Sequence, residues 1–167
     1  EANATIDWRS YVNKVVVPDC EPIDLIASGD QAPDYIERVR SFSWNNFFEK
    51  SAGGDLLDRW RTEWKSLYDF ILIDSRTGIT DTGGVCTIYL PDILVLVFSA
   101  NYQSFERGME IASGVQKARR DLAVPRPPLA VLPLPGRFDG RDEVDEAQFW
   151  LNRFAEELKP FYDDWLP

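Results

Sequence analysis

Three uninterrupted apolar runs constrain the fold of this chain more than any other feature. They lie at 70–73 (FILI), 93–98 (ILVLVF) and 129–132 (LAVL). Short apolar runs that do not alternate with polar residues are typical of parallel strands buried on both faces. Helical spacing of apolar residues separates them, at 54–67 and from Ser104 to Asp121. The pattern predicts an α/β fold with an open, mostly parallel sheet and helices on both faces.

Further elements complete this predicted order. Shorter β runs precede the sheet strands, at 13–17 and 22–28, and a segment at 80–90 suggests a short helix. A last helix begins near Asp142, where apolar residues recur every three or four positions. A chain of 167 residues is long enough for one domain with a core, so we expect a single domain over 1–167.

Charge and composition narrow the classes of function. The net charge of −10 disfavours nucleic acid and anionic membranes as partners. The chain contains no histidine, which excludes Ser-His and Cys-His catalysis and histidine-bound metals. Cys20 and Cys86 have no CxxC spacing, and no apolar run could span a bilayer. We therefore expect a cytoplasmic protein whose chemistry relies on carboxylates, backbone amides and oxygen-bound ions such as Mg²⁺.

Polar and small residues follow four of the predicted strands. These segments are Ser28-Gly29-Asp30, Asp74-Ser75-Arg76-Thr77-Gly78, Ser99-Ala100-Asn101 and Pro133-Leu134-Pro135-Gly136-Arg137. In an open parallel sheet, ligands bind beyond the carboxyl ends of the strands. The sequence therefore predicts a binding site at this edge of the sheet.

Asp74 is the most informative residue of these segments. A carboxylate at the end of a buried strand can hold Mg²⁺ directly or through water. Gly78 lets the backbone approach a phosphate closely, and Ser75 or Thr77 could donate hydroxyls. An alternative interpretation is purely structural: Asp74 caps the next turn and Gly78 turns the chain.

The amino-acid sequences of these segments resemble those of a known family. YDFILIDSRTGITDTGG is similar to the Walker B and switch region of ParA/MinD-like, deviant-Walker P-loop ATPases, and within them to bacterial ATPases with a KGGVGR-type P-loop. PIDLIASG, LPDILVLVFSANYQS and LAVLPLPGRFDGRDE resemble further strands of that fold, in order. The resemblance covers roughly residues 22–160.

The resemblance implies a role for each matching residue. Asp74 would be the Walker B-type aspartate, catalytic through its support of Mg²⁺. Ser75, Thr77 and Gly78 would lie in the switch loop beside the γ-phosphate of ATP. Pro135 and Arg137 would lie near the adenine, and Asn101 would lie where the sheet edge faces the phosphates.

The departures from the family are equally specific. The family begins with a Gly-rich loop that ends in Lys-Ser or Lys-Thr, and no such loop occurs in this chain. We expect the chain to be the C-terminal two-thirds or so of a larger nucleotide-binding domain, inactive alone and an ATPase when the P-loop is present. Arg76 replaces a proline of some relatives. It could neutralise charge in the transition state or form a surface ion pair.

Three functional hypotheses follow. The first is a switch ATPase that binds Mg-ATP and acts on protein partners or fused signalling or repeat modules. The resemblance to the family also allows a homodimer. The second is a non-catalytic protein-interaction module with an NTPase-like fold. The third, an α/β enzyme with Asp74 as base, lacks a visible nucleophile.

Two further features of the sequence allow more than one interpretation. Trp44, Phe47 and Phe48 could form a partner surface or a satellite core. Arg119 and Arg120, near the end of a predicted helix, are explained by the helix dipole.

Overall fold

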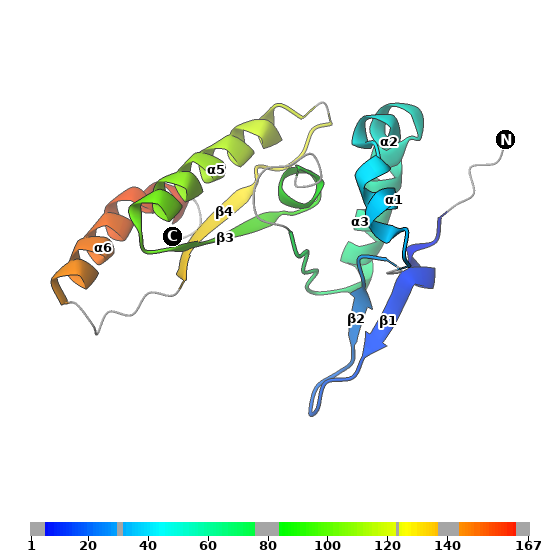
Figure 1. Cartoon of the computed structure of the whole chain (residues 1–167), viewed down its shortest axis with the longest axis horizontal. Coiled ribbons are helices and arrows are strands. Elements are labelled where there is room, and N and C mark those ends of the chain that lie inside the picture. The colour runs from blue at the N-terminus through cyan, green and yellow to red at the C-terminus, as the bar shows by residue number, and fades with distance from the viewer. Residues whose placement is uncertain (1–5, 30–31, 76–83, 123, 137–143, 163–167) are drawn as a thin grey trace. The chain divides into compact units, whose positions relative to one another are not determined.

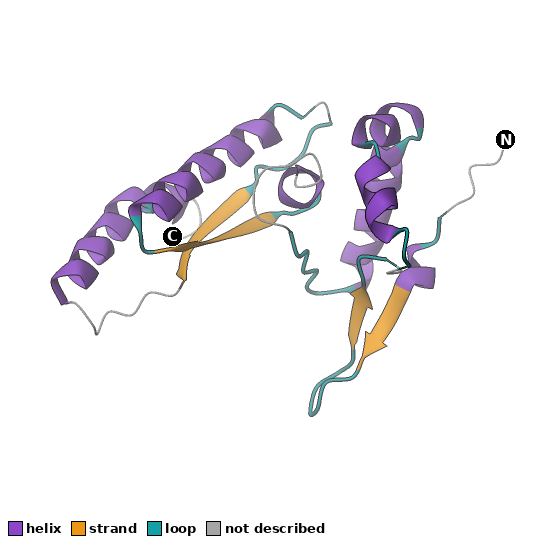
Figure 2. Ribbon diagram, in the orientation of Figure 1, coloured by secondary structure: helices purple, strands orange, loops and turns teal. Residues whose placement is uncertain are grey.

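The computed structural model describes residues 6–29, 32–75, 84–122, 124–136 and 144–162. The protein has a mixed α/β structure, with one antiparallel and one parallel pair of strands and helices beside them (Figures 1 and 2). Contacts divide the chain into two compact units, Glu1–Phe70 and Ile71–Pro167, and each is described by itself. The prediction that they belong to one domain stays a prediction.

The first unit contains a hairpin and three α-helices. A short 3-10 helix, η1 (Trp8–Tyr11), leads into β1 (Val12–Val15), which pairs antiparallel with β2 (Ile23–Ile26) in the register Val12↔Ile26. The β runs expected at 13–17 and 22–28 are confirmed as strands. The helices α1 (Tyr35–Ser41), α2 (Trp44–Lys50) and α3 (Gly53–Leu67) follow.

The helix α3 confirms the prediction made from apolar spacing over 54–67. Trp8 is buried and makes edge contacts with Trp64 and Tyr68, at ring-centroid distances of 6.1 and 6.3 Å. Its indole Nε1 donates a hydrogen bond of 2.9 Å to Glu63 Oε2. The aromatic residues of α3 therefore join η1 to the helix, as residues with an apolar body and one polar atom often do.

The second unit contains the parallel pair. A π-helix, η2 (Val85–Tyr89), precedes β3 (Ile93–Ser99), and α5 (Tyr102–Arg120) connects β3 to β4 (Ala130–Gly136). The strands pair from Ile93↔Ala130 to Ser99↔Gly136. Parallel neighbours need such a crossover helix because their ends lie at opposite edges. The strands expected near 93–98 and 129–132 are confirmed.

Two helices at the C-terminus complete this unit, α6 (Val144–Glu157) and α7 (Lys159–Tyr162). Aromatic and aliphatic side chains from β3, α5, α6 and the residue that follows α6 form one buried cluster, which contains Phe98, Phe105, Trp150, Phe154 and Leu158. A second cluster joins α5 to β4 through Ala112, Val115, Leu129 and Val131. Burying a side chain such as Phe105 contributes roughly 1.5–3 kcal/mol, so these clusters define the core of the unit.

Two expectations about the sheet are wrong in this structure. Residues 70–74 form irregular backbone instead of a strand, and Phe70 and Leu72 are 87% and 94% exposed. A strand needs a neighbour for its N–H and C=O groups, and none pairs with this segment within the described residues. The strand β3 is not buried on both faces, because Ile93, Val95 and Val97 are exposed while Phe98 is buried.

Candidate functional site

The carboxyl ends of β3 and β4 lie side by side, and this edge is the part of the predicted site that the structure describes. Ser99 is the register partner of Gly136, and Phe98 is the partner of Pro135. A Cβ atom added at Gly136 would lie 2.8 Å from Val97 Cγ1, so a larger residue there would require the exposed Val97 side chain to move. Two of the four polar segments singled out in the sequence are thus brought together.

Asn101 has a structural role at this edge. Its side-chain Oδ1 accepts a hydrogen bond of 2.9 Å from the backbone N–H of Ser104, which makes Asn101 the N-cap of α5. The apolar spacing predicts a helix from Ser104, whereas α5 begins at Tyr102. Ser104 Oγ accepts a hydrogen bond of 3.0 Å from Ser99 N–H, and this bond fixes the end of β3 to the first turn of α5.

The other predicted site residues are distributed as follows. Pro135 is half-buried near the end of β4. Asp74 is exposed and Ser75 is half-buried, both on the irregular segment that precedes the gap at 76–83. Thr77, Gly78 and Arg137, and also Arg76, lie outside the described residues.

Asp74 fits a magnesium site of the kind that nucleotides complete. Mg²⁺ in such sites is bound through one or two carboxylates, with waters and phosphate oxygens as the other ligands. Asp74 supplies one exposed carboxylate, which is a ligand of this type. In the described part of the chain no group of three or more Cys, Asp or Glu side chains gathers as a metal site.

Arg119 has a structural role that the helix-dipole interpretation did not predict. Its side chain is 2% exposed, and the guanidinium donates to the backbone carbonyl groups of Ile88, Tyr89 and Pro127. These bonds join α5 to the end of η2 and to the loop before β4. The fixed fork of five N–H donors explains how one side chain reaches three carbonyls.

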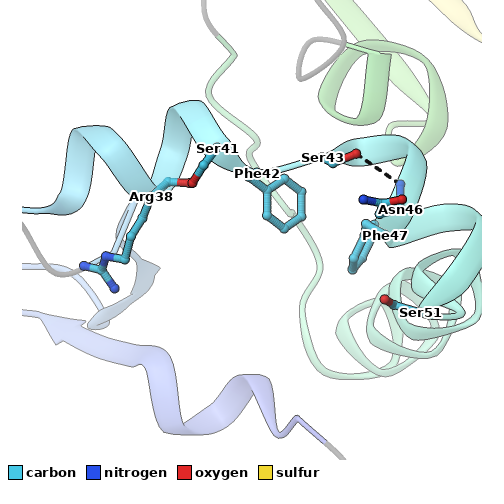
Figure 3. A pocket seen from close by; sticks show the side chains of 7 residues that line it. All are labelled: Arg38, Ser41, Phe42, Ser43, Asn46, Phe47 and Ser51. Carbon is cyan, nitrogen blue, oxygen red and sulfur yellow. Dashed lines mark hydrogen bonds between the residues drawn. The ribbon is translucent and has the colours of Figure 1, made fainter.

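A surface pocket of about 410 Å³ lies at the corner between α1 and α2 (Figure 3). Its lining combines one cation, three hydroxyls, one carboxamide and two aromatic rings, from Arg38, Ser41, Phe42, Ser43, Asn46, Phe47 and Ser51. Ser43 Oγ accepts a hydrogen bond of 3.3 Å from Asn46 N–H and caps α2. Of the three aromatic residues singled out in the sequence, Trp44, Phe47 and Phe48, only Phe47 lines this pocket.

Comparisons with protein-family models, with curated proteins and with solved structures found no match for this chain.

None of the helices in the described part of the chain combines the length and apolar character needed to cross a bilayer.

Proposed function

We propose that this chain is part of a nucleotide-dependent switch ATPase that binds Mg-ATP beyond the carboxyl ends of its parallel strands. Asp74 supports Mg²⁺ in this proposal, and Ser75, Thr77 and Gly78 lie beside the γ-phosphate. Pro135 and Arg137 are near the adenine. The observation that carries the proposal is the resemblance of residues 70–84 to a Walker B and switch segment.

The parallel pair supports this proposal. β3 and β4 place Ser99, Asn101 and Pro135 at one edge, the position at which open parallel sheets bind ligands. The exposed apolar side chains of Ile93 and Val95 leave room for further cover on the second face of the pair. We propose that the complete domain is an open, mostly parallel sheet with helices on both faces, to which this pair contributes two strands.

The test is Mg²⁺-dependent ATP turnover by the native gene product that contains this chain. We expect Asp74→Ala to lower turnover by at least about tenfold, because the carboxylate that supports the metal is lost. Asp69→Ala is the matched control, since Asp69 is an exposed aspartate five positions earlier and should leave turnover unchanged. Unchanged turnover in Asp74→Ala would contradict the proposed role.

A second candidate function is a protein-interaction module with an NTPase-like fold that does not hydrolyse nucleotide. The pocket between α1 and α2 favours it, because aromatic rings with a polar rim are typical of protein-binding surfaces. This alternative is favoured if the wild-type native gene product neither binds nor hydrolyses Mg-ATP.

A further inference from the structure

The pocket at the corner of α1 and α2 has a fixed aromatic wall. The rings of Phe42 and Phe47 are 5.8 Å apart between centroids. A Cβ atom added at Gly53 would lie 2.3 Å from the Phe47 ring, so this ring packs directly on the backbone at the start of α3. Phe42 is 49% exposed. One ring is therefore held in place from behind, and the other presents an open apolar surface.

The rim of the pocket suits a peptide. Figure 3 shows the Asn46 carboxamide on the same side of the corner as the two rings. A carboxamide both donates and accepts, so it can pair with the C=O and N–H of a peptide backbone. Every lining residue except Phe47 is exposed. A surface this open does not enclose a small molecule, whereas it can hold one or two side chains of an extended segment.

The charge of the pocket differs from that of the whole chain. None of its lining residues is acidic, although Asp and Glu number 28 in a chain of net charge −10. Arg38 lines it, and Arg40 lies in the same last turn of α1. Arg38 Nε lies 3.2 Å from Asp34 Oδ2, in a pair whose side chains are both more than half exposed. Exposed ion pairs contribute little free energy, so another carboxylate can replace Asp34 as the partner of Arg38 at little cost.

From these observations we propose that the pocket between α1 and α2 binds a short acidic segment of a partner protein. An apolar side chain of the segment lies against Phe42 and Phe47, Asn46 pairs with its backbone, and Arg38 faces its carboxylate. A basic segment would be attracted instead to the acidic remainder of the chain. The proposal involves no residue of the nucleotide site, so it stands or fails independently of ATP binding.

The test is a titration of the isotope-labelled chain, followed by NMR, with two blocked tetrapeptides. One is acetyl-Glu-Leu-Phe-Glu-amide, and the other has lysine in place of both glutamates. We expect the acidic peptide to shift the amide signals of residues 38–51 saturably, and roughly fivefold more tightly than the basic peptide. Phe42→Ala and Asn46→Ala should each weaken the acidic peptide severalfold.

Phe70→Ala is the matched control, because Phe70 is a phenylalanine outside the pocket that is exposed to a greater extent. Its spectrum should respond to the acidic peptide as the wild-type spectrum does. The spectra also report whether each variant is folded. The proposal is overturned if no saturable shift occurs within residues 38–51, if both peptides bind equally, or if Phe42→Ala binds as wild type does.

Discussion

At the scale of single residues, two carboxylates of the first unit combine charge pairing with hydrogen bonds from neutral donors. Lys14 pairs with Asp24, whose Oδ2 also accepts a hydrogen bond of 2.6 Å from the Tyr68 hydroxyl, and both contacts hold the pKa of Asp24 below its ordinary value. The Trp8 indole and then Arg9 act in the same way on the pKa of Glu63. These contacts join the hairpin and η1 to the end of α3.

The lowered pKa values have a consequence for stability. A carboxylate whose pKa is lower in the folded state stabilises the fold above its unfolded pKa of about 4, and this contribution is lost as pH falls through the folded pKa. We expect the first unit to lose stability below about pH 4. Asp24→Asn should lower stability at pH 7 and make its fall with acid less steep. Urea unfolding at pH 7, 5 and 3, followed by the amide signals of β1 and β2, measures this.

Asp69→Asn serves as the control for that experiment, because Asp69 is an exposed aspartate two residues after the end of α3. Its unfolding midpoint should follow the wild-type dependence on pH. If Asp24→Asn also followed it, the bonds to Lys14 and Tyr68 would have no stabilising role.

At the scale of elements, Arg119 connects three parts of the second unit that are distant in sequence. The last carbonyl groups of a helical turn lack partners within the turn, and the Arg119 guanidinium supplies donors to Ile88 and Tyr89 at the end of η2. Its third bond holds Pro127 before β4. The neighbouring Arg120 is exposed, so two adjacent arginines at the end of one helix have different roles.

We expect Arg119→Met to destabilise the second unit by about 2–3 kcal/mol, because the part-buried hydrogen bonds from the charged guanidinium to three carbonyl groups are lost. Arg119→Lys should recover only part of this loss, since an ammonium lacks the planar fork. Arg120→Met is the matched control and should change stability by less than about 0.5 kcal/mol. Urea unfolding gives the free energies, and hydrogen exchange over residues 85–90 reports the local effect. Equal losses in the two Met variants would contradict the role of Arg119.

The elements also show which features a sequence can predict. Apolar spacing determined α3 and α5 because a helix forms its hydrogen bonds within one segment. The strands at 93–98 and 129–132 were predictable because each is the neighbour of the other. The run at 70–73 has the same composition, yet its conformation depends on a partner strand that the run itself cannot specify. The difference between Arg119 and Arg120 depends on tertiary packing, so the dipole argument could not find it.

At the scale of the whole molecule, the candidate site is described only in part. The sequence pattern correctly placed Ser99 and Pro135 at one edge, because parallel strands end on the same side. The position of Asp74 could not be predicted in the same way, because the conformation of residues 70–74 depends on strand pairing, which local pattern does not specify. On β3 the side chains of Ile93, Val95 and Val97 are exposed, so one face of the parallel pair is apolar.

The proposal that this chain belongs to a larger nucleotide-binding domain is tested most directly by the intact mass and N-terminal sequence of the native gene product. We expect a product longer than 167 residues, with a Gly-rich loop ending in Lys-Ser or Lys-Thr before the residue numbered Glu1 here. A native product that begins at or near Glu1 would contradict the proposal, because the amides and the lysine that hold the phosphates of ATP would then be missing.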